Sequence, residues 1–251
     1  MKKIFLIMLF IVSLTCNISS EEISQDFFNY LHSVSCFVKS SDGTGTGLFI
    51  SKTNGNTYVL TAAHVVEDAR KLFSSKFDRI KIQAFVFQDY IKVGLKESDA
   101  EVIRYSSNKV GQDLALLRLC QKNFTTNSAK FYMGDEKDIR VGKTLIHLGN
   151  FEGEYASYSF SQGNLSHKGR VINNRSYWQT TIPIYFGSSG GGIFNFSQEC
   201  VGIVTRRFDS TLNLCIPINR VRDFAKTNDC EWIFNEDCSK INDKFVEDKY
   251  D

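Results

Sequence analysis

The chain has 251 residues, with 30 basic and 28 acidic side chains and a formal net charge of +2. This length suits one large all-β unit or two small barrels. The near balance of charge argues against nucleic acid as a partner, because the chain lacks the basic excess that such binding requires.

The N-terminus has the pattern of a secretory signal peptide. Lys2 and Lys3 precede an apolar stretch over 4–14, and small and polar residues follow it. This pattern predicts a signal peptide over 1–20. The apolar stretch covers 14 − 4 + 1 = 11 residues, fewer than the roughly 20 that a membrane-spanning helix needs. We therefore expect a secreted or periplasmic protein without a stable membrane span, with lipidation at Cys16 as a minor alternative.

The cysteines favour disulfide bonds in an exported chain. Seven cysteines less Cys16 leave 7 − 1 = 6, an even number. Cys230 and Cys238 would close a short loop, and Cys200 would meet Cys215 across neighbouring strands. About 15 pairings exist for six cysteines, and buried thiols that pack as small hydrophobic groups are an equal alternative. The spacing fits no zinc signature, so we expect neither a metal nor another cofactor.

Short strands dominate the first half of the chain. Apolar residues at helical spacing predict a helix over 26–32, followed by a strand over 34–39. Short β-branched or aromatic segments, separated by polar or glycine-containing turns, then predict a sandwich or barrel. These further strands are expected over 57–60, 80–86, 100–103 and 114–119.

A polar stretch over 121–130 separates this set from a second one. The second set is expected over 144–148, 156–160, 177–184, 192–194, 201–205 and 214–216. A helix over 219–227 and an exposed, highly charged tail over 235–251 complete the prediction. The sequence thus divides into the signal peptide 1–20, a first β unit 21–129, a second β unit 130–222 and a C-terminal helix end and tail 223–251.

Three motifs present a histidine, an aspartate and a serine in that order. They are TAAH (61–64), QDLALL (112–117) and GSSGG (187–191). A nucleophilic serine needs an imidazole to take its proton and a carboxylate to orient that imidazole. We predict Ser189 as the nucleophile, His64 as the base and Asp113 as the orienting group, in a cleft between the two units. The remaining histidines, His32, His147 and His167, lack the motif and are expected to pack or to lie at the surface.

These motifs resemble those of trypsin-like serine proteases with the chymotrypsin fold, above all the catalytic domain of the HtrA/Deg branch. The resemblance covers residues 26–221 and also includes GTGLFI (45–50), LGN (148–150) and IPIN (216–219). It implies an all-β fold of two packed antiparallel β-barrels with short N- and C-terminal helices. It also implies a serine endopeptidase that hydrolyses protein or peptide substrates through an acyl-enzyme.

The glycine-rich motif predicts the oxyanion hole. Because Gly187 lacks a Cβ, the backbone can bend so that its N–H and that of Ser189 point at one spot. The substrate pocket is expected from Ile184, Tyr185, Phe186, Ile203, Val204 and Thr205. No acidic residue lies between Tyr177 and Ser189, which favours a small or medium apolar side chain at the cleaved position over Lys or Arg.

Some family features are not expected here. Relatives usually append PDZ domains, whereas 251 − 217 = 34 residues follow Pro217, too few for one. The N-terminal helix resembles the trimer-forming region of the family, so a monomer and a homotrimer are both compatible with the sequence. Two rival functions are a catalytically silent trypsin-like fold that acts as a binding protein, and an esterase with the same acyl chemistry.

Overall fold

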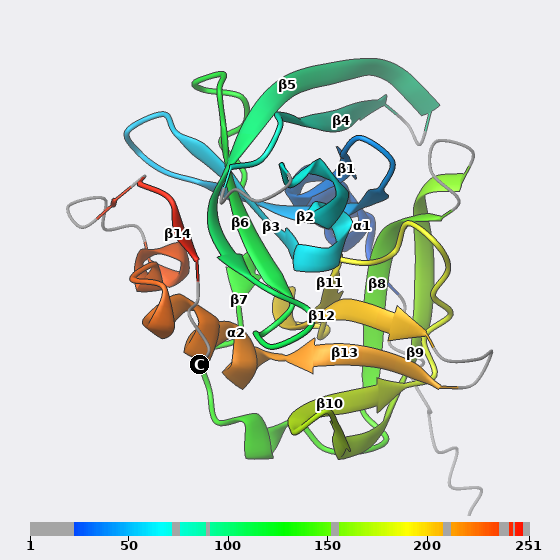
Figure 1. Ribbon diagram of the computed structural model, residues 1–251. Helices are drawn as coiled ribbons and strands as arrows, with labels where there is room; N and C mark the ends of the chain where they lie inside the picture. The colour runs from blue at the N-terminus through cyan, green and yellow to red at the C-terminus, as the bar shows by residue number, and fades with distance from the viewer. Residues whose placement is uncertain are drawn as a thin grey trace, which may run out of the picture.

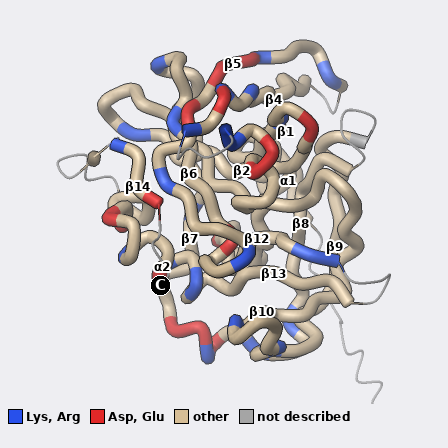
Figure 2. Tube along the Cα trace, viewed as in Figure 1, with Lys and Arg blue, Asp and Glu red and all other residues tan. Residues whose placement is uncertain are grey.

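Two β-barrels contain most of the strands in the computed structural model, which describes residues 23–71, 76–88, 91–151, 156–207, 212–235, 241–242 and 244–247. The first barrel lies above the second in Figure 1, and a short helix accompanies each. The expected all-β fold of two antiparallel barrels with short helices is confirmed. Basic and acidic residues are interspersed along the trace in Figure 2.

The first barrel is a sheet in the order β14-β5-β4-β1-β2-β3-β6, and an additional pairing of β5 with β6 closes it. Its antiparallel strands are β1 (Ser35–Lys39), β2 (Thr44–Ser51), β3 (Thr57–Ala62), β4 (Ile80–Gln88), β5 (Ile91–Ser106) and β6 (Leu114–Leu119). Two 3₁₀ turns, η1 (Ala63–Val65) and η2 (Glu67–Ala69), follow β3. The predicted strand over 114–119 agrees with β6, whereas β4 and β5 form a longer hairpin than expected.

The second barrel has the order β11-β8-β9-β10-β13-β12-β7, and β11 also pairs with β12. Its strands are β7 (Lys130–Phe131), β8 (Thr144–Phe151), β9 (Ala156–Ile172), β10 (Arg175–Thr180), β11 (Gly192–Phe194), β12 (Glu199–Arg207) and β13 (Asn213–Pro217); η3 (Glu136–Asp138) lies between β7 and β8. The strand expected over 177–184 ends earlier, at Thr180. The chain from there to β11 is a loop that carries Ser189.

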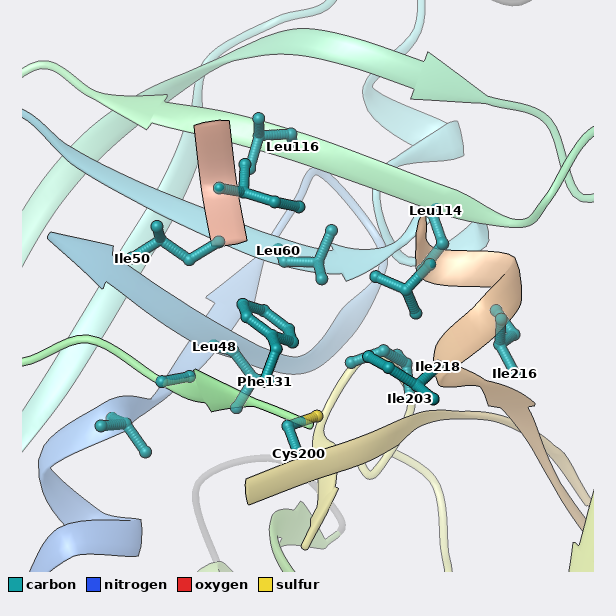
Figure 3. Close-up of a cluster of buried hydrophobic side chains, with 14 of the residues drawn as sticks. Leu48, Ile50, Leu60, Leu114, Leu116, Phe131, Cys200, Ile203, Ile216 and Ile218 are labelled. Carbon is teal, nitrogen blue, oxygen red and sulfur yellow. The ribbon is translucent and has the colours of Figure 1, made fainter. Parts of the chain in front are cut away.

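Alternation along the strands divides side chains between two cores. In β6, Leu114 and Leu116 point into the core between the barrels, whereas Ala115 and Leu117 point into the first barrel. Successive residues of a strand face opposite sides, so a continuous apolar run is buried on both faces. Figure 3 shows the core between the barrels, where residues of the first barrel meet Phe131 and others of the second half.

The two helices cover this core. Helix α1 (Gln25–Val34) begins after Ser24, whose hydroxyl accepts a hydrogen bond from the Phe27 N–H at 3.2 Å, as N-cap serines do. Helix α2 (Ile218–Thr227) buries Val221 and Phe224 and is followed by η4 (Glu231–Phe234). None of the helices in the described segments combines the length and apolar character needed to cross a membrane.

The expected disulfide between Cys200 and Cys215 is not formed, because both thiols are free. In the sheet, Cys215 pairs with Val204 and packs inside the second barrel, whereas Cys200 packs in the core between the barrels. Neighbouring strands therefore hold the two sulfur atoms on opposite faces. The suggested partner of Cys230, Cys238, lies outside the described residues, as do Cys16 and the expected signal peptide.

Part of the C-terminal segment returns to the first barrel, where Phe245 and Glu247 are half-buried, whereas Asn235, Asn242 and Lys244 are exposed as expected. Strand β14 (Val246–Glu247) pairs in parallel with β5. The Glu247 carboxylate accepts two hydrogen bonds from the Arg70 guanidinium, at 2.7 and 2.9 Å. The buried Arg104 guanidinium donates to the Lys244 carbonyl at 2.6 Å. The Glu247 carboxylate therefore has a charged partner in the fold, while the Lys244 side chain is exposed.

Candidate active site

The imidazole of His64 lies beside the carboxylate of Asp113. His64 follows β3 directly and Asp113 precedes β6, and the pairing of Ala62 with Leu114 brings the two strand ends together. The His64 Nδ1 atom is 3.0 Å from each Asp113 carboxylate oxygen, and the His64 backbone N–H donates to Oδ1 at 3.1 Å. The Asp113 side chain is fully buried, whereas the imidazole is 28% exposed. Two of the three predicted catalytic residues are thus in direct contact.

Asp113 is held as a carboxylate. Burial alone raises its pKa, but the hydrogen bond and charge of His64 and the hydroxyl of Thr205, 2.5 Å from Oδ2, outweigh burial and hold the pKa of Asp113 below its usual range. A carboxylate only accepts hydrogen bonds, so the imidazole proton is expected on Nδ1 and a lone pair on Nε2. The described residues contain no group of three or more His, Cys, Asp or Glu side chains that could hold a metal ion.

Ser189 reaches the pair through Thr205. Its hydroxyl donates to the Thr205 carbonyl at 3.1 Å, while the Thr205 side chain binds Asp113. Within the described segments, no hydrogen bond joins the Ser189 hydroxyl to His64. A hydroxyl has a single proton to donate, so Ser189 must turn away from Thr205 before it can bond to the imidazole. The sequence assigned Thr205 to the substrate pocket and did not indicate its bond to Asp113.

In the turn around Ser189, the carbonyl groups of Gly187 and Ser189 accept hydrogen bonds from Thr46, while the N–H groups of the same two residues stay unpaired within the described residues. Gly187 and Gly190 have positive φ values of 92° and 86°, which glycine adopts without steric cost. The Thr46 hydroxyl donates to the Gly187 carbonyl at 2.7 Å, and the Thr46 N–H donates to the Ser189 carbonyl at 2.8 Å. The N–H groups of Gly187 and Ser189 have no hydrogen-bond partner in the described part of the chain. Both donors are therefore available to a ligand.

Thr46 is itself held by a buried asparagine. Its hydroxyl accepts hydrogen bonds from the backbone N–H of Asn150 at 3.0 Å and from the side-chain amide at 3.2 Å. Both residues are at most 1% exposed. They occur in the motifs noted in the sequence, but nothing in those motifs indicates that the Thr46 side chain reaches Gly187, 141 positions along the chain.

The predicted pocket residues fall into two groups. Ile184, Ile203 and Val204 pack into the hydrophobic cores, as their exposures of 4% or less require. Tyr185 is 49% exposed and Phe186 is 91% exposed, beside Gly187. The Tyr185 ring packs against Phe151, with centroids 5.3 Å apart, and lies 5.4 Å from the Arg207 guanidinium. Tyr185 and Phe186 are thus the accessible apolar side chains of the predicted set.

His147 lies beneath the serine turn and fills a packing role. It is fully buried, and its Nδ1 is 2.9 Å from the Gly192 carbonyl oxygen. A Cβ added to Gly191 would lie 2.5 Å from the imidazole Cε1, so ring and turn are in close contact. Burial lowers the pKa of His147 to about 4. The imidazole is therefore neutral in the folded protein.

Acid should destabilise the fold through this histidine. In the unfolded chain the pKa of His147 is about 6.5, whereas in the folded protein it is about 4. Its contribution to stability is fully present above pH 6.5, falls progressively as the pH drops below 6.5, and is lost by about pH 4. We expect the free energy of urea unfolding to drop by about 2 kcal/mol more between pH 7 and 4.5 in the native protein than in His147→Gln. Equal drops in the two proteins would contradict this assignment.

The fold and the site together define a class of protein. Two closed β-barrels, with an imidazole–carboxylate pair from the first and a glycine-rich serine turn from the second, are the arrangement of chymotrypsin-like proteins. The family described as Trypsin-like peptidase domain matches residues 45–203. The chain belongs to this family.

Within the family, the chain is similar to HtrA and DegP-like proteins. It is 29% identical over 199 residues to the serine protease Do-like HtrA of Bacillus subtilis (strain 168), covering 74% of this chain and 39% of that protein. It is 31% identical over 195 residues to a probable periplasmic serine endoprotease, DegP-like, of Pseudomonas putida (strain W619), covering 74% and 35%. The chain thus matches less than half the length of these relatives.

Solved structures share the fold. The serine endoprotease from Yersinia pestis aligns with a TM-score of 0.62 and 19% identity, over 82% of this chain and 67% of that one. The structure of Deg5 aligns with the same TM-score and 23% identity, over 79% and 90%. These similarities agree with the double-barrel architecture described above.

Proposed function

We propose that the chain is a serine endopeptidase in which Ser189 is the nucleophile, His64 the general base and Asp113 the orienting carboxylate. The buried contact between His64 and Asp113, with Ser189 linked to the same carboxylate through Thr205, carries this proposal. The similarity of the chain to serine proteases supports the proposal. The expected substrates are proteins or peptides.

The proposed reaction starts when Ser189 turns its hydroxyl from the Thr205 carbonyl to His64 Nε2. His64 takes the proton as the serine oxygen attacks the peptide carbonyl carbon, and the carbonyl electron pair moves to its oxygen. The N–H groups of Gly187 and Ser189 stabilise that oxyanion. His64 then gives the proton to the departing amine, which leaves an acyl-enzyme. Water then attacks the ester carbonyl while His64 takes its proton, and His64 passes that proton to the Ser189 oxygen as the acid product leaves.

The proposed specificity is apolar. Tyr185 and Phe186 precede the oxyanion turn and are exposed, and we propose that they contact the side chain of the cleaved residue. Apolar contacts of this kind discriminate weakly, by about 1–3 kcal/mol per methylene group. Arg207 donates to the Ile184 carbonyl at 3.3 Å, and this bond supports a role for Arg207 in holding the segment before the turn.

We further propose that the protein acts outside the cytoplasm. Residues 1–20 have the pattern of a signal peptide, and a relative is described as periplasmic. Pairing of Cys230 with Cys238 would be compatible with such a compartment. A mass difference of about two hydrogens after reduction tests that pairing.

Labelling by a fluorophosphonate probe tests the proposed chemistry. The probe reacts with activated serines, so the folded protein should gain one adduct, and peptide mapping should place it on Ser189 rather than Ser188. Heat-denatured protein is the control and should not react. Incubation with a denatured protein mixture should release peptides, and a comparison of ester with peptide substrates separates an esterase. A folded protein that never reacts would favour the binding-protein alternative.

Removing the Thr46 hydroxyl should slow the reaction. In Thr46→Val the Gly187 carbonyl loses its donor, and the oxyanion turn is freer to rotate. We expect kcat to fall about tenfold, or about 1.4 kcal/mol of barrier, with little change in KM. Thr46→Ser keeps the hydroxyl and should restore most of the rate. The matched control is Thr57→Val, because the buried Thr57 hydroxyl has no partner in the described segments. Equal losses in the two valine variants would argue against a role for the Thr46–Gly187 bond.

A further inference from the structure

The loop over 107–113 carries Asp113 in a strained conformation. It joins β5 to β6 and ends on Asp113, whose φ is 61°. This left-handed conformation costs a residue other than glycine about 1–2 kcal/mol, although aspartate tolerates it better than most. Such a conformation persists where the surroundings hold it in place. The loop has its own bonds, including Gly111 N–H to the Ser107 carbonyl at 2.8 Å.

Two arginines of the second half of the chain donate hydrogen bonds to this loop of the first barrel. Arg175, at the start of β10, donates to the carbonyl groups of Asn108 at 2.9 Å and Lys109 at 2.7 Å. Arg220, in α2, donates through Nε to the Gln112 side-chain oxygen at 2.7 Å and through Nη2 to the Gln112 carbonyl at 2.9 Å. The two arginines therefore hold both ends of the loop, and Gln112 directly precedes Asp113.

Arg220 is itself rigidly placed. It is 7% exposed, its guanidinium lies 4.6 Å from the centre of the Tyr177 ring, and its Nη1 donates to the Ser176 carbonyl at 3.2 Å. Its hydrogen bonds to Gln112 and Ser176 go to carbonyl or amide oxygens. The planar guanidinium suits several acceptors in fixed directions, whereas an ammonium group is a point charge. Ser176 follows Arg175 in β10, so Arg220 of α2 contacts the second barrel directly beside Arg175.

We propose that Arg220 and Arg175 form a clamp between the barrels that positions Asp113 against His64. They are positioning residues and do not contact substrate, and this inference rests on the proposed function. Displacements of about 1 Å at a catalytic group can cost on the order of a hundredfold in rate. The clamp thus makes the geometry of the catalytic pair in the first barrel depend on docking of the second barrel, which carries the nucleophile.

Arg220→Lys tests the clamp, because lysine keeps the positive charge and loses the fork of donors. We expect kcat for a small peptide substrate to fall about tenfold, with KM within about twofold. The acid limb of the pH profile of kcat/KM should move to lower pH by about half a unit, because a displaced carboxylate stabilises the His64 imidazolium less. A purely structural role would reduce the active fraction without moving this limb.

The matched control is Arg222→Lys on the same helix. Arg222 also makes three hydrogen bonds, to Asn219 Oδ1 at 2.8 Å and to the carbonyl groups of Tyr132 at 2.6 Å and Gly134 at 3.1 Å, none of them in the loop. Its kcat and acid limb should stay within about twofold and a tenth of a unit of the native values. Equal effects of the two lysine variants on both readouts would overturn the clamp.

A second variant keeps the test decisive if Arg220→Lys folds poorly. Gln112→Ala removes the side-chain acceptor of Arg220 from the loop itself, and it should lower kcat and move the acid limb in the same direction. Because the two residues act through one contact, the double variant should lose no more than about twofold beyond the larger single loss. Fully multiplicative losses would contradict the proposal. If the native protein is not labelled by the fluorophosphonate, the proposed function fails instead, which is a separate outcome.

Discussion

Ser189→Ala is expected to abolish fluorophosphonate labelling and to lower peptide hydrolysis by about 10⁶-fold. Alanine removes the oxygen that attacks the substrate, and no acyl-enzyme can form at this position. The fold should survive, because the Ser189 hydroxyl makes one hydrogen bond, to the Thr205 carbonyl. Labelling of folded protein and the rate of peptide release measure the loss.

Ser188→Ala is the neighbouring control. The Ser188 hydroxyl accepts a hydrogen bond from the Tyr185 N–H at 3.1 Å, and the residue is 1% exposed. Its removal leaves the oxygen of Ser189 in place, so the variant should still be labelled. If Ser189→Ala were still labelled, or if only Ser188→Ala lost labelling, Ser189 would not be the nucleophile.

Much of the fold was predictable because side chains alternate between the two faces of a strand, so the pattern of apolar residues shows which faces are buried. The run LALLRL over 114–119 gave a strand with the correct bounds, and the short apolar segments gave two β units. The limits of the strand over 177–184 were less predictable. Ile182 and Ile184 are apolar and buried, yet they lie in the loop beyond β10, because burial in a core does not require a sheet partner.

The motifs predicted His64 and Asp113 as partners, and the structure places the two side chains in direct contact; their catalytic roles stay predictions. The residues that hold these groups in place carried no such signal. Thr46, Thr205 and Arg220 act through hydrogen bonds that span between 92 and 141 positions of the chain, and only the packing of the barrels brings these partners together. The free thiols of Cys200 and Cys215 show the same limit, since their spacing says nothing of which face each occupies.

Asp113→Asn is expected to lower kcat by about 10⁴-fold while leaving the fold intact. Asparagine has the same shape, but it has no negative charge to stabilise the His64 imidazolium. One of the two carboxylate oxygens is also replaced by an amide nitrogen, which donates hydrogen bonds. Because Nδ1 lies 3.0 Å from both Asp113 oxygens, the donor favours the tautomer with its proton on Nε2. That tautomer cannot accept the proton of Ser189. Steady-state kinetics at neutral pH measure the loss.

Thr205→Val separates the charge of Asp113 from its placement. Valine removes the hydroxyl that lies 2.5 Å from Oδ2 but leaves the carboxylate ionised and its three contacts with His64 intact. The loss in kcat should therefore be about tenfold, far smaller than in Asp113→Asn. The pKa of Asp113 should also rise, because one of the hydrogen bonds that lower it is gone. If Asp113→Asn kept more than about a tenth of the native rate, the carboxylate would not be the group that orients His64.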